Sequence, residues 1–193
     1  MRKAEISRKT KETAISLRLN LDGKGACRAK TGVGFLDHML DLLARHGGLD
    51  LTVTAKGDVH VDDHHLVEDV GIVLGQALEQ SLGKKEGIVR YGWATVPMDE
   101  ALVMCALDLG GRPYLAYGLE LPAKRVKGFD TELIEEFLRA VVNAAGMNLH
   151  LRQLDGRNTH HIIEAAFKAF ARALGQAVAK SGKGGVPSTK GVL

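Results

Sequence analysis

The sequence predicts an α+β fold built by internal duplication of a two-layer β-β-β-α-β-α half-domain, with each sheet covered on one face by helices. Three observations lead to this prediction. The order of strand-like and helix-like segments is the same in both halves of the 193-residue chain. A His-His-x-x-Glu motif that begins at His64 recurs 96 residues later, at His160. The chain is also long and apolar enough, at 45% hydrophobic residues, to form a packed core without disulfides.

The first half begins with short segments of alternating apolar and polar residues, which is the pattern of strands with one buried face. From Phe35 onward apolar side chains recur at helical spacing, and the pair Gly47-Gly48 ends this helix. A β-rich segment and a long amphipathic helix follow. The predicted strands are 4–8, 14–19, 25–30 and 49–54, and the predicted helices are 35–45 and 63–82.

The second half repeats this order. Asp63 and Thr159 are the expected N-caps of the two helices that carry the motif, because short polar side chains there accept hydrogen bonds from the first turn. The predicted strands of this half are 92–96, 101–107, 114–121 and 149–152, and the predicted helices are 132–145 and 158–179.

The repeat can be tested by direct comparison. Placing residues 64–82 on residues 160–178 gives six identities in 19 positions. Three of the six are the polar residues of the motif, which shared helical patterning does not explain, so a duplicated half-domain is the economical interpretation. The connection at 83–89 is too short for a flexible linker between domains. We therefore expect one domain over residues 1–193, with repeats at about 1–88 and 89–180 and a Gly-rich C-terminal tail at 181–193.

Composition excludes several classes of protein. The 26 Lys and Arg residues against 23 Asp and Glu give a net charge of only +3, and their dispersal argues against a nucleic-acid partner. No apolar run approaches the roughly 18 residues of a membrane span, and no secretory signal is visible. Cys27 and Cys105 are too few and too far apart for a disulfide scaffold or a Cys-based zinc site. A cytoplasmic protein without nucleic-acid or membrane partners is expected.

Eight histidines are the unusual feature of the composition, because four of them form two adjacent pairs at predicted helix starts. In each motif the first histidine and the glutamate are four residues apart, so they share a helix face and can bind one ion. The second histidine is rotated by about 100° and can face another ion or a neighbouring subunit. Imidazole with carboxylate suits Mn, Fe, Co, Ni or Zn, and two such helices predict a dinuclear site. The residues are His64, His65, Glu68, His160, His161 and Glu164.

The other histidines carry less information. His38, on the first predicted helix, and His150, on the strand before the second motif helix, are further candidate ligands, and each alone also fits a structural histidine. His46 stands at a helix end, where a cation interacts favourably with the helix dipole. His60 alternates with valines and is expected to be an exposed strand residue.

Several cations could hold an anionic substrate, among them Arg90. Lys168 lies four residues beyond Glu164 and therefore shares its helix face. Arg112 follows two glycines and precedes a proline, which predicts a turn that holds the guanidinium in a fixed direction. The segment 184–191 combines glycines, hydroxyls and a lysine, a composition suited to wrapping a phosphate or to a disordered basic end.

Several long motifs occur in a fixed order along the chain. They are KET at 11–13, GFLDHMLD at 34–41, DDHHLVED at 62–69, DLGGRPY at 108–114, NTHHIIEA at 158–165 and PSTKGVL at 187–193. With these motifs the chain resembles the imidazoleglycerol-phosphate dehydratases over residues 2–193. One position departs from the family pattern, because Leu42 stands where many members have Gln.

The resemblance implies a manganese-dependent hydro-lyase that converts D-erythro-imidazole glycerol phosphate to imidazole acetol phosphate in histidine biosynthesis. It implies two Mn²⁺ ions per active site and a homo-24-mer built from trimers, about two dozen subunits with active sites between them. The positions that match metal ligands of the family are His38, His64, His65, Glu68, His150, His160, His161 and Glu164. Those that match substrate contacts are Glu12, Arg90, Arg112, Lys168, Ser188 and Lys190.

The chemistry explains why such residues are needed. The substrate must lose a proton from a carbon that has no carbonyl group beside it. When the imidazole ring of the substrate is bound to a metal as an imidazolate, it can expel the hydroxyl on the carbon next to the ring. A carboxylate then takes the proton from the neighbouring carbon. Glu12 is the expected catalytic acid–base because it matches a substrate position and no ligand position, and Glu164 is the competing catalytic residue.

Three other functions remain as alternatives at this point. A dinuclear metal phosphohydrolase would share the ligands and the cations, and differs in releasing free phosphate. A metal-storage assembly would bind ions without turnover. An RNA-binding module would need exposed aromatics and a basic stripe, and the nine aromatic residues of the chain (five Phe, three Tyr, one Trp) argue against it.

Overall fold

The structure is a computed structural model that describes residues 2–191 and 193. Met1 and Val192, the latter part of the C-terminal motif, lie outside the described residues. The first half contains β1 (Lys3–Lys9), β2 (Thr13–Asn20), β3 (Cys27–Lys30), α1 (Gly34–Gly47), β4 (Asp50–Gly57) and α2 (His64–Leu82). The second half contains β5 (Tyr91–Met98), β6 (Ala101–Asp108), β7 (Tyr114–Gly118), β8 (Arg125–Val126), β9 (Phe129–Asp130), α3 (Leu133–Ala145), β10 (Asn148–Asp155) and α4 (Thr159–Val178).

The two four-stranded sheets have the same topology. Their strand orders are β1-β2-β4-β3 and β5-β6-β10-β7. In each sheet the first three strands are antiparallel, and the last strand runs parallel to its neighbour. The predicted α+β fold is confirmed, and the matching sheets are consistent with the predicted duplication.

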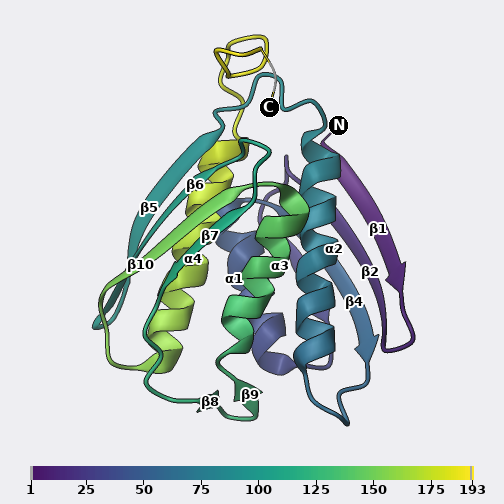
Figure 1. Cartoon of the computed structure of the whole chain (residues 1–193), viewed down its shortest axis with the longest axis vertical. Helices are drawn as coiled ribbons and strands as arrows, with labels where there is room; N and C mark the ends of the chain where they lie inside the picture. Colours follow the sequence, from purple (N-terminus) through teal and green to yellow (C-terminus); the bar gives the residue numbers. More distant parts are fainter. Residues whose placement is uncertain (1, 192) are drawn as a thin grey trace.

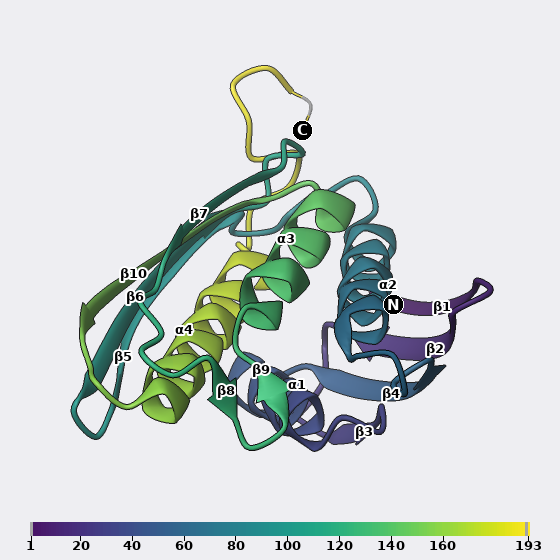
Figure 2. The same cartoon turned by 60° about the horizontal axis from the view of Figure 1, so that its bottom comes forward.

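The helices α1 to α4 of the described residues fill the space between the two sheets (Figures 1 and 2). Helix α2 packs on the first sheet and α4 on the second. Each of them also contacts a helix of the other half, α2 against α3 and α4 against α1. Residues of α1 and α4, far apart in the sequence, are therefore neighbours in space.

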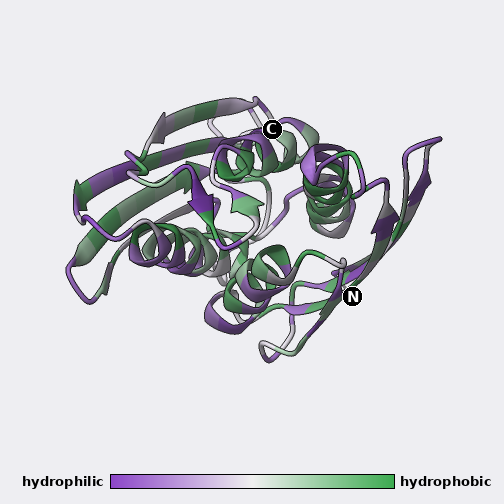
Figure 3. Cartoon of the chain, turned by 90° about the horizontal axis from the view of Figure 1, so that it is seen from below, coloured by the Kyte–Doolittle hydropathy of each residue, from purple (hydrophilic) through white to green (hydrophobic). Residues whose placement is uncertain are grey.

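Alternation in the strands and periodicity in the helices place the core between the sheets. Ile15, Leu17 and Leu19 of β2 are buried, and the residues between them face outward. The hydrophobic faces of the helices turn inward (Figure 3). Gly75 of α2 permits close approach of α3, because a Cβ there would lie 2.6 Å from the carbonyl oxygen of Val141. Each buried aliphatic side chain contributes about 1.5–3 kcal/mol to stability.

Five local features differ from the sequence predictions. Asp63 precedes α2 as expected, but its side chain accepts no hydrogen bond from the first turn, and Oδ1 of Asp62 accepts one from the His64 amide instead. The strand predicted to reach residue 121 ends at Gly118, and the small β8–β9 hairpin follows it unpredicted. The N-cap of α4 is Asn158 and not Thr159, because the Asn158 side chain accepts hydrogen bonds from the first-turn amides. The hydroxyl of Thr159 instead accepts from the amide of Ala123. His60 is exposed as predicted, but it lies in a turn after β4.

None of the described helices is both long enough and apolar enough to cross a membrane.

Candidate active site

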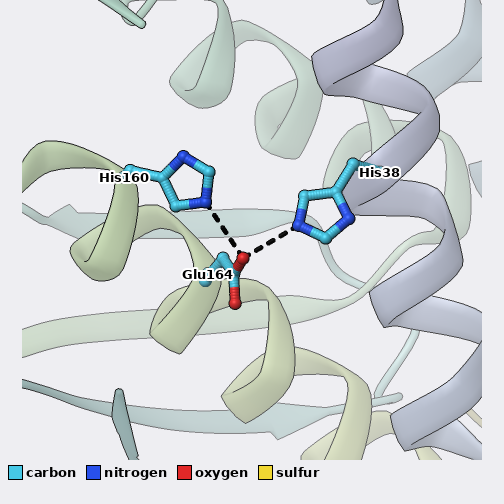
Figure 4. Close-up of side chains that lie close together, drawn as sticks. All are labelled: His38, His160 and Glu164. Carbon is cyan, nitrogen blue, oxygen red and sulfur yellow. Dashed lines mark hydrogen bonds and ion pairs between the residues drawn. The ribbon is translucent and has the colours of Figure 1, made fainter. Parts of the chain in front are cut away.

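Three predicted ligands converge where α1 and α4 pack together (Figure 4). Oε1 of Glu164 lies 2.8 Å from Nε2 of His38 and 3.0 Å from Nε2 of His160. His160 and Glu164 are one turn apart on α4, and His38 comes from α1 in the other half of the chain. Among the described residues these three form the one group of histidine, cysteine and acidic side chains close enough to share an ion.

Local structure explains why α4 presents these side chains. Oδ1 of Asn158 accepts hydrogen bonds from the amides of His160 and His161, so the helix begins directly before the histidine pair. The ring of Phe35 on α1 packs edge-on against the His160 ring, with 5.5 Å between centroids. Phe35 in turn contacts Phe129 of β9 at 5.1 Å. The unpredicted hairpin therefore supports the aromatic residue that packs beside the ligands.

Glu164 is the most buried member of the group, with 9% of its side chain exposed. Burial raises the pKa of this carboxyl, but hydrogen bonds from Lys168, His38 and His160 outweigh burial and lower the pKa of Glu164 to about 2. Nζ of Lys168 lies 2.5 Å from Oε2, the oxygen that faces away from the histidines. The carboxylate is therefore ionised at neutral pH and both of its oxygens have partners.

The group fits a divalent metal ion. The three ligand atoms lie within 4.8 Å of one another, so one ion can contact all of them. The side chains of His38 and His160 are 42% and 41% exposed, which leaves the site open on one side. Two imidazole nitrogens and a carboxylate oxygen are a donor set that Mn²⁺, Fe²⁺, Co²⁺, Ni²⁺ and Zn²⁺ accept.

The second histidine of each pair points away from the first, as its helical rotation predicts. The rings of His160 and His161 are nearly perpendicular, and so are those of His64 and His65. Nδ1 of His161 lies 2.7 Å from Oε2 of Glu100. The hydrogen bond to Glu100 raises the pKa of His161, and the hydrogen bonds from His161 and from the Asn158 amide lower the pKa of Glu100 to about 2.

The first half has a similar pair. Nδ1 of His65 lies 3.0 Å from Oδ2 of Asp58, and this hydrogen bond raises the pKa of His65. The carboxylate of Glu12 approaches the same nitrogen less closely, at 4.0 Å. Two histidines on different helices thus have an acidic partner at the same ring atom.

The remaining predicted ligands do not join the group at α1 and α4. His64 and Glu68 lie on α2, which packs against α3. His150 on β10 is exposed between buried Leu149 and Leu151, so it faces away from the helices and contacts the Tyr114 ring at 5.6 Å. His150 and the α4 ligands are therefore on opposite faces of the second sheet.

Four of the six predicted substrate residues line one pocket of about 830 Å³ at the end of the second sheet, next to the C-terminal tail. The described part of the tail folds into tight turns, in which the Ser188 hydroxyl accepts a hydrogen bond from the Lys190 amide. Lys85 adds a further cation to the wall. The four predicted residues are Arg90, Arg112, Ser188 and Lys190.

Arg90 is held firmly in this pocket. Its guanidinium donates to both carboxylate oxygens of Asp108, at 2.7 and 3.0 Å, and to the carbonyl of Pro187 at 2.8 Å. Its φ of 78° is in the left-handed region that non-glycine residues rarely adopt. Strained backbone of this kind concentrates at functional sites.

The other two predicted substrate residues lie elsewhere. Lys168 lies beside the candidate metal group formed by His38, His160 and Glu164. Its Nζ pairs with Glu164 and lies 3.2 Å from Sδ of Met98. Glu12 is in the β1–β2 turn, with 54% of its side chain exposed. Leu42 is partly buried against the core, and its aliphatic side chain offers no polar contact.

Sequence reasoning missed the two acidic partners, Asp58 and Glu100. The signal for Glu100 was present in the repeat. Glu12 and Glu100 each stand directly before the first buried residue of the second strand in their half, Thr13 and Ala101. The duplication thus relates Glu100 to a residue already singled out.

The comparisons with known proteins agree with this geometry. The family model described as imidazoleglycerol-phosphate dehydratase matches residues 31–174. The imidazoleglycerol-phosphate dehydratase of Desulforamulus reducens is 62% identical over 193 residues, covering 100% of this chain and 98% of that protein. That of Ruegeria pomeroyi is 58% identical, with 100% of both chains covered.

Solved structures give the same result. The dehydratase of Staphylococcus aureus superposes with a TM-score of 0.84 at 44% identity, covering 92% of this chain and 99% of that one. The enzyme of Pyrococcus furiosus gives a TM-score of 0.85 at 39% identity, covering 97% and 100%. The sequence, the fold and the metal group all lead to one conclusion: the chain belongs to the imidazoleglycerol-phosphate dehydratase family.

Proposed function

We propose that the chain catalyses the Mn²⁺-dependent dehydration of imidazole glycerol phosphate to imidazole acetol phosphate, a step of histidine biosynthesis. The observation that carries this proposal is the convergence of His38, His160 and Glu164 in a member of this family. A divalent ion bound there supplies a Lewis acid to the imidazole ring of the substrate. Every other task in the reaction falls to side chains of the protein.

The cationic pocket is proposed to hold the phosphate. Arg90 is fixed by Asp108, while the side chain of Arg112 is exposed beside it. Ser188 and Lys190 on the tail complete the wall, and hydroxyl and ammonium groups both donate to phosphate oxygens. Holding the phosphate at one end fixes the position of the reacting carbons at the other.

Glu12 is proposed to remove the proton from the carbon beside the departing hydroxyl. Its carboxylate is exposed, and Oε2 lies 4.0 Å from Nδ1 of His65. Glu164 is less suited to this role, because His38, His160 and Lys168 already occupy its two oxygens. Glu164 therefore serves as a ligand, with Lys168 stabilising its charge.

We propose that two ions are bound per active site and that the site is completed between subunits of a homo-24-mer built from trimers. The placement of the predicted ligands supports this. His150 faces outward from the second sheet, and the α2 residues His64 and Glu68 are separate from the group on α4. A ligand on the outer face of a sheet reaches an ion only if another subunit brings that ion to it.

Two broader assignments accompany the proposal. We propose that residues 1–193 form a single dehydratase domain with repeats at about 1–88 and 89–180 and a tail at 181–193. The packing of α1 on α4 across the two halves supports this.

We also propose that the protein acts in the cytoplasm. The free Cys27 and Cys105 support a reducing compartment.

The product identifies the reaction. Incubating metal-free protein with imidazole glycerol phosphate and then adding Mn²⁺ is expected to yield the ketone imidazole acetol phosphate with its phosphate retained. Release of inorganic phosphate would instead identify a phosphohydrolase. Tight metal binding with neither product would identify a metal-storage protein.

Arg112→Ala is expected to raise KM for the substrate by about 10–100-fold, because a hydrogen bond to a charged group contributes about 1.5–3 kcal/mol. The turnover number should change less, since the phosphate does not react. Steady-state kinetics check this, with Arg139→Ala on α3 as a control that also removes an exposed guanidinium. Equal KM values for the two variants would exclude Arg112 from the phosphate site.

A further inference from the structure

The turn between β5 and β6 reaches the first turn of α4 through one carboxylate. Oε2 of Glu100 lies 2.7 Å from Nδ1 of His161. Oε1 accepts hydrogen bonds from the backbone amides of Asn158, at 2.7 Å, and Arg157, at 3.3 Å. Glu100 therefore connects the histidine ring to the backbone that begins the helix.

This geometry determines which nitrogen of His161 is available to a metal. An ionised carboxylate only accepts hydrogen bonds, so Nδ1 carries the hydrogen. Nε2 is then left as the atom that can bind an ion, and it faces away from Glu100. Oδ2 of the neighbouring Asp99 lies 3.6 Å from Nε2, so this nitrogen is in an acidic environment.

The first half reaches the same result with a different residue. Nδ1 of His65 is 3.0 Å from Oδ2 of Asp58, which follows the end of β4. Gly57, the residue directly before Asp58, is the structural equivalent of Gly156, the residue directly before Arg157. A Cβ on Gly57 would meet Leu66 and Thr13, and one on Gly156 would meet the equivalent Ile162 and Ala101.

The residue after each glycine can therefore be compared. Asp58 in the first half corresponds to Arg157 in the second, which has no carboxylate to offer. Glu100 takes over the partnership with the histidine there. In the first half the equivalent of Glu100 is Glu12, which stays 4.0 Å from His65 because Asp58 already holds that ring.

We propose that Glu100 is a positioning residue that holds His161 with Nε2 presented to a metal ion, the task that Asp58 performs for His65. The assignment rests on the proposed function, because it takes both histidines as ligands. It also gives the two equivalent glutamates different roles. Glu100 is engaged with His161, whereas Glu12 is released from His65 and available to the substrate.

Glu100→Gln tests the proposal, because an amide has one acceptor oxygen where the carboxylate has two. The variant cannot accept from both His161 and the Asn158 amide. We expect the affinity for Mn²⁺ to fall about 10–100-fold, as is typical when the partner of a metal-binding histidine is removed. Titration of metal-free protein followed by electron paramagnetic resonance of free Mn²⁺ measures this directly.

Three variants make the result specific. Glu100→Asp keeps two acceptor oxygens and should bind Mn²⁺ more tightly than Glu100→Gln. Asp58→Asn should weaken binding in the same way, and Glu135→Gln, which breaks an exposed ion pair on α3, should not. In Glu100→Gln the Mn²⁺ concentration that gives half-maximal activity should rise. The kcat at saturating Mn²⁺ and the KM for the substrate should stay near their wild-type values. General loss of structure would not separate these quantities in this way.

The outcomes separate this inference from the proposed function. If wild-type protein forms the ketone with Mn²⁺ but Glu100→Gln binds Mn²⁺ as tightly as wild type, the positioning role is wrong and the dehydratase stands. A fall in kcat at saturating Mn²⁺ with unchanged Mn²⁺ affinity would also overturn the positioning role. If wild-type protein neither binds Mn²⁺ nor forms the ketone, the proposed function fails first.

Discussion

His38→Ala or His160→Ala is expected to abolish Mn²⁺-dependent turnover while leaving the chain folded. Each histidine supplies one of three ligand atoms at the α1–α4 contact, and each lies within 3.0 Å of the shared oxygen of Glu164. Replacing an outer partner of a metal-bound histidine costs about 10–100-fold in affinity, so loss of the ligand itself should cost more. Mn²⁺ titration and steady-state assays of the two variants measure the effect.

The fold should tolerate these changes. Both side chains are more than one-third exposed, and alanine favours helix. His46→Ala is the matched control, because it removes another histidine from α1 near its C-terminal end. Circular dichroism should show the same helix content in all three variants. Full activity in His38→Ala with Mn²⁺ bound as in wild type would remove His38 from the site.

Glu12→Gln is expected to lower kcat by about 10²–10⁴-fold, the usual contribution of a general acid–base group. The number of bound Mn²⁺ ions and their affinity should not change, because the glutamine keeps the shape of the side chain and Asp58 still holds His65. Loss of turnover with retained metal would separate a proton-transfer role from a ligand role. Turnover assays and Mn²⁺ titration of the same preparation provide both measurements.

The matched control for this variant is Glu5→Gln. Glu5 lies on β1, in the same hairpin as Glu12, and is an exposed acidic residue paired with Arg18. The Glu5→Gln variant should have the same kcat as the wild-type protein. Near-normal kcat in Glu12→Gln would transfer the base to Glu164, the competing carboxylate, despite its contacts with two histidines and Lys168.

Regular elements and the repeated motif were predictable from the sequence because both depend on local periodicity. Strand β2 alternates buried and exposed residues, and α4 presents His160 and Glu164 one turn apart. The identity of the two sheet topologies follows from the same duplication. Chain pattern and residue spacing were therefore sufficient for the fold and for two of the three grouped residues, His160 and Glu164.

Features that depend on tertiary contacts were not predictable in this way. His38 joins the group only because α1 of one half packs on α4 of the other, and sequence spacing does not encode that contact. The two-residue strands of the β8–β9 hairpin are too short for a periodic signal. Asn158 and Thr159 are both good capping residues. Thr159 is not the cap because its hydroxyl accepts a hydrogen bond from the amide of Ala123.

Metal content per chain should be measured together with the mass of the assembly, before and after chelation. We expect two Mn²⁺ ions per chain in an assembly of about two dozen chains, with ions and dehydratase activity lost together on chelation and regained with Mn²⁺. The reason is that a single chain brings only three of its eight proposed ligands together. A fully active monomer with one ion per chain would contradict this expectation.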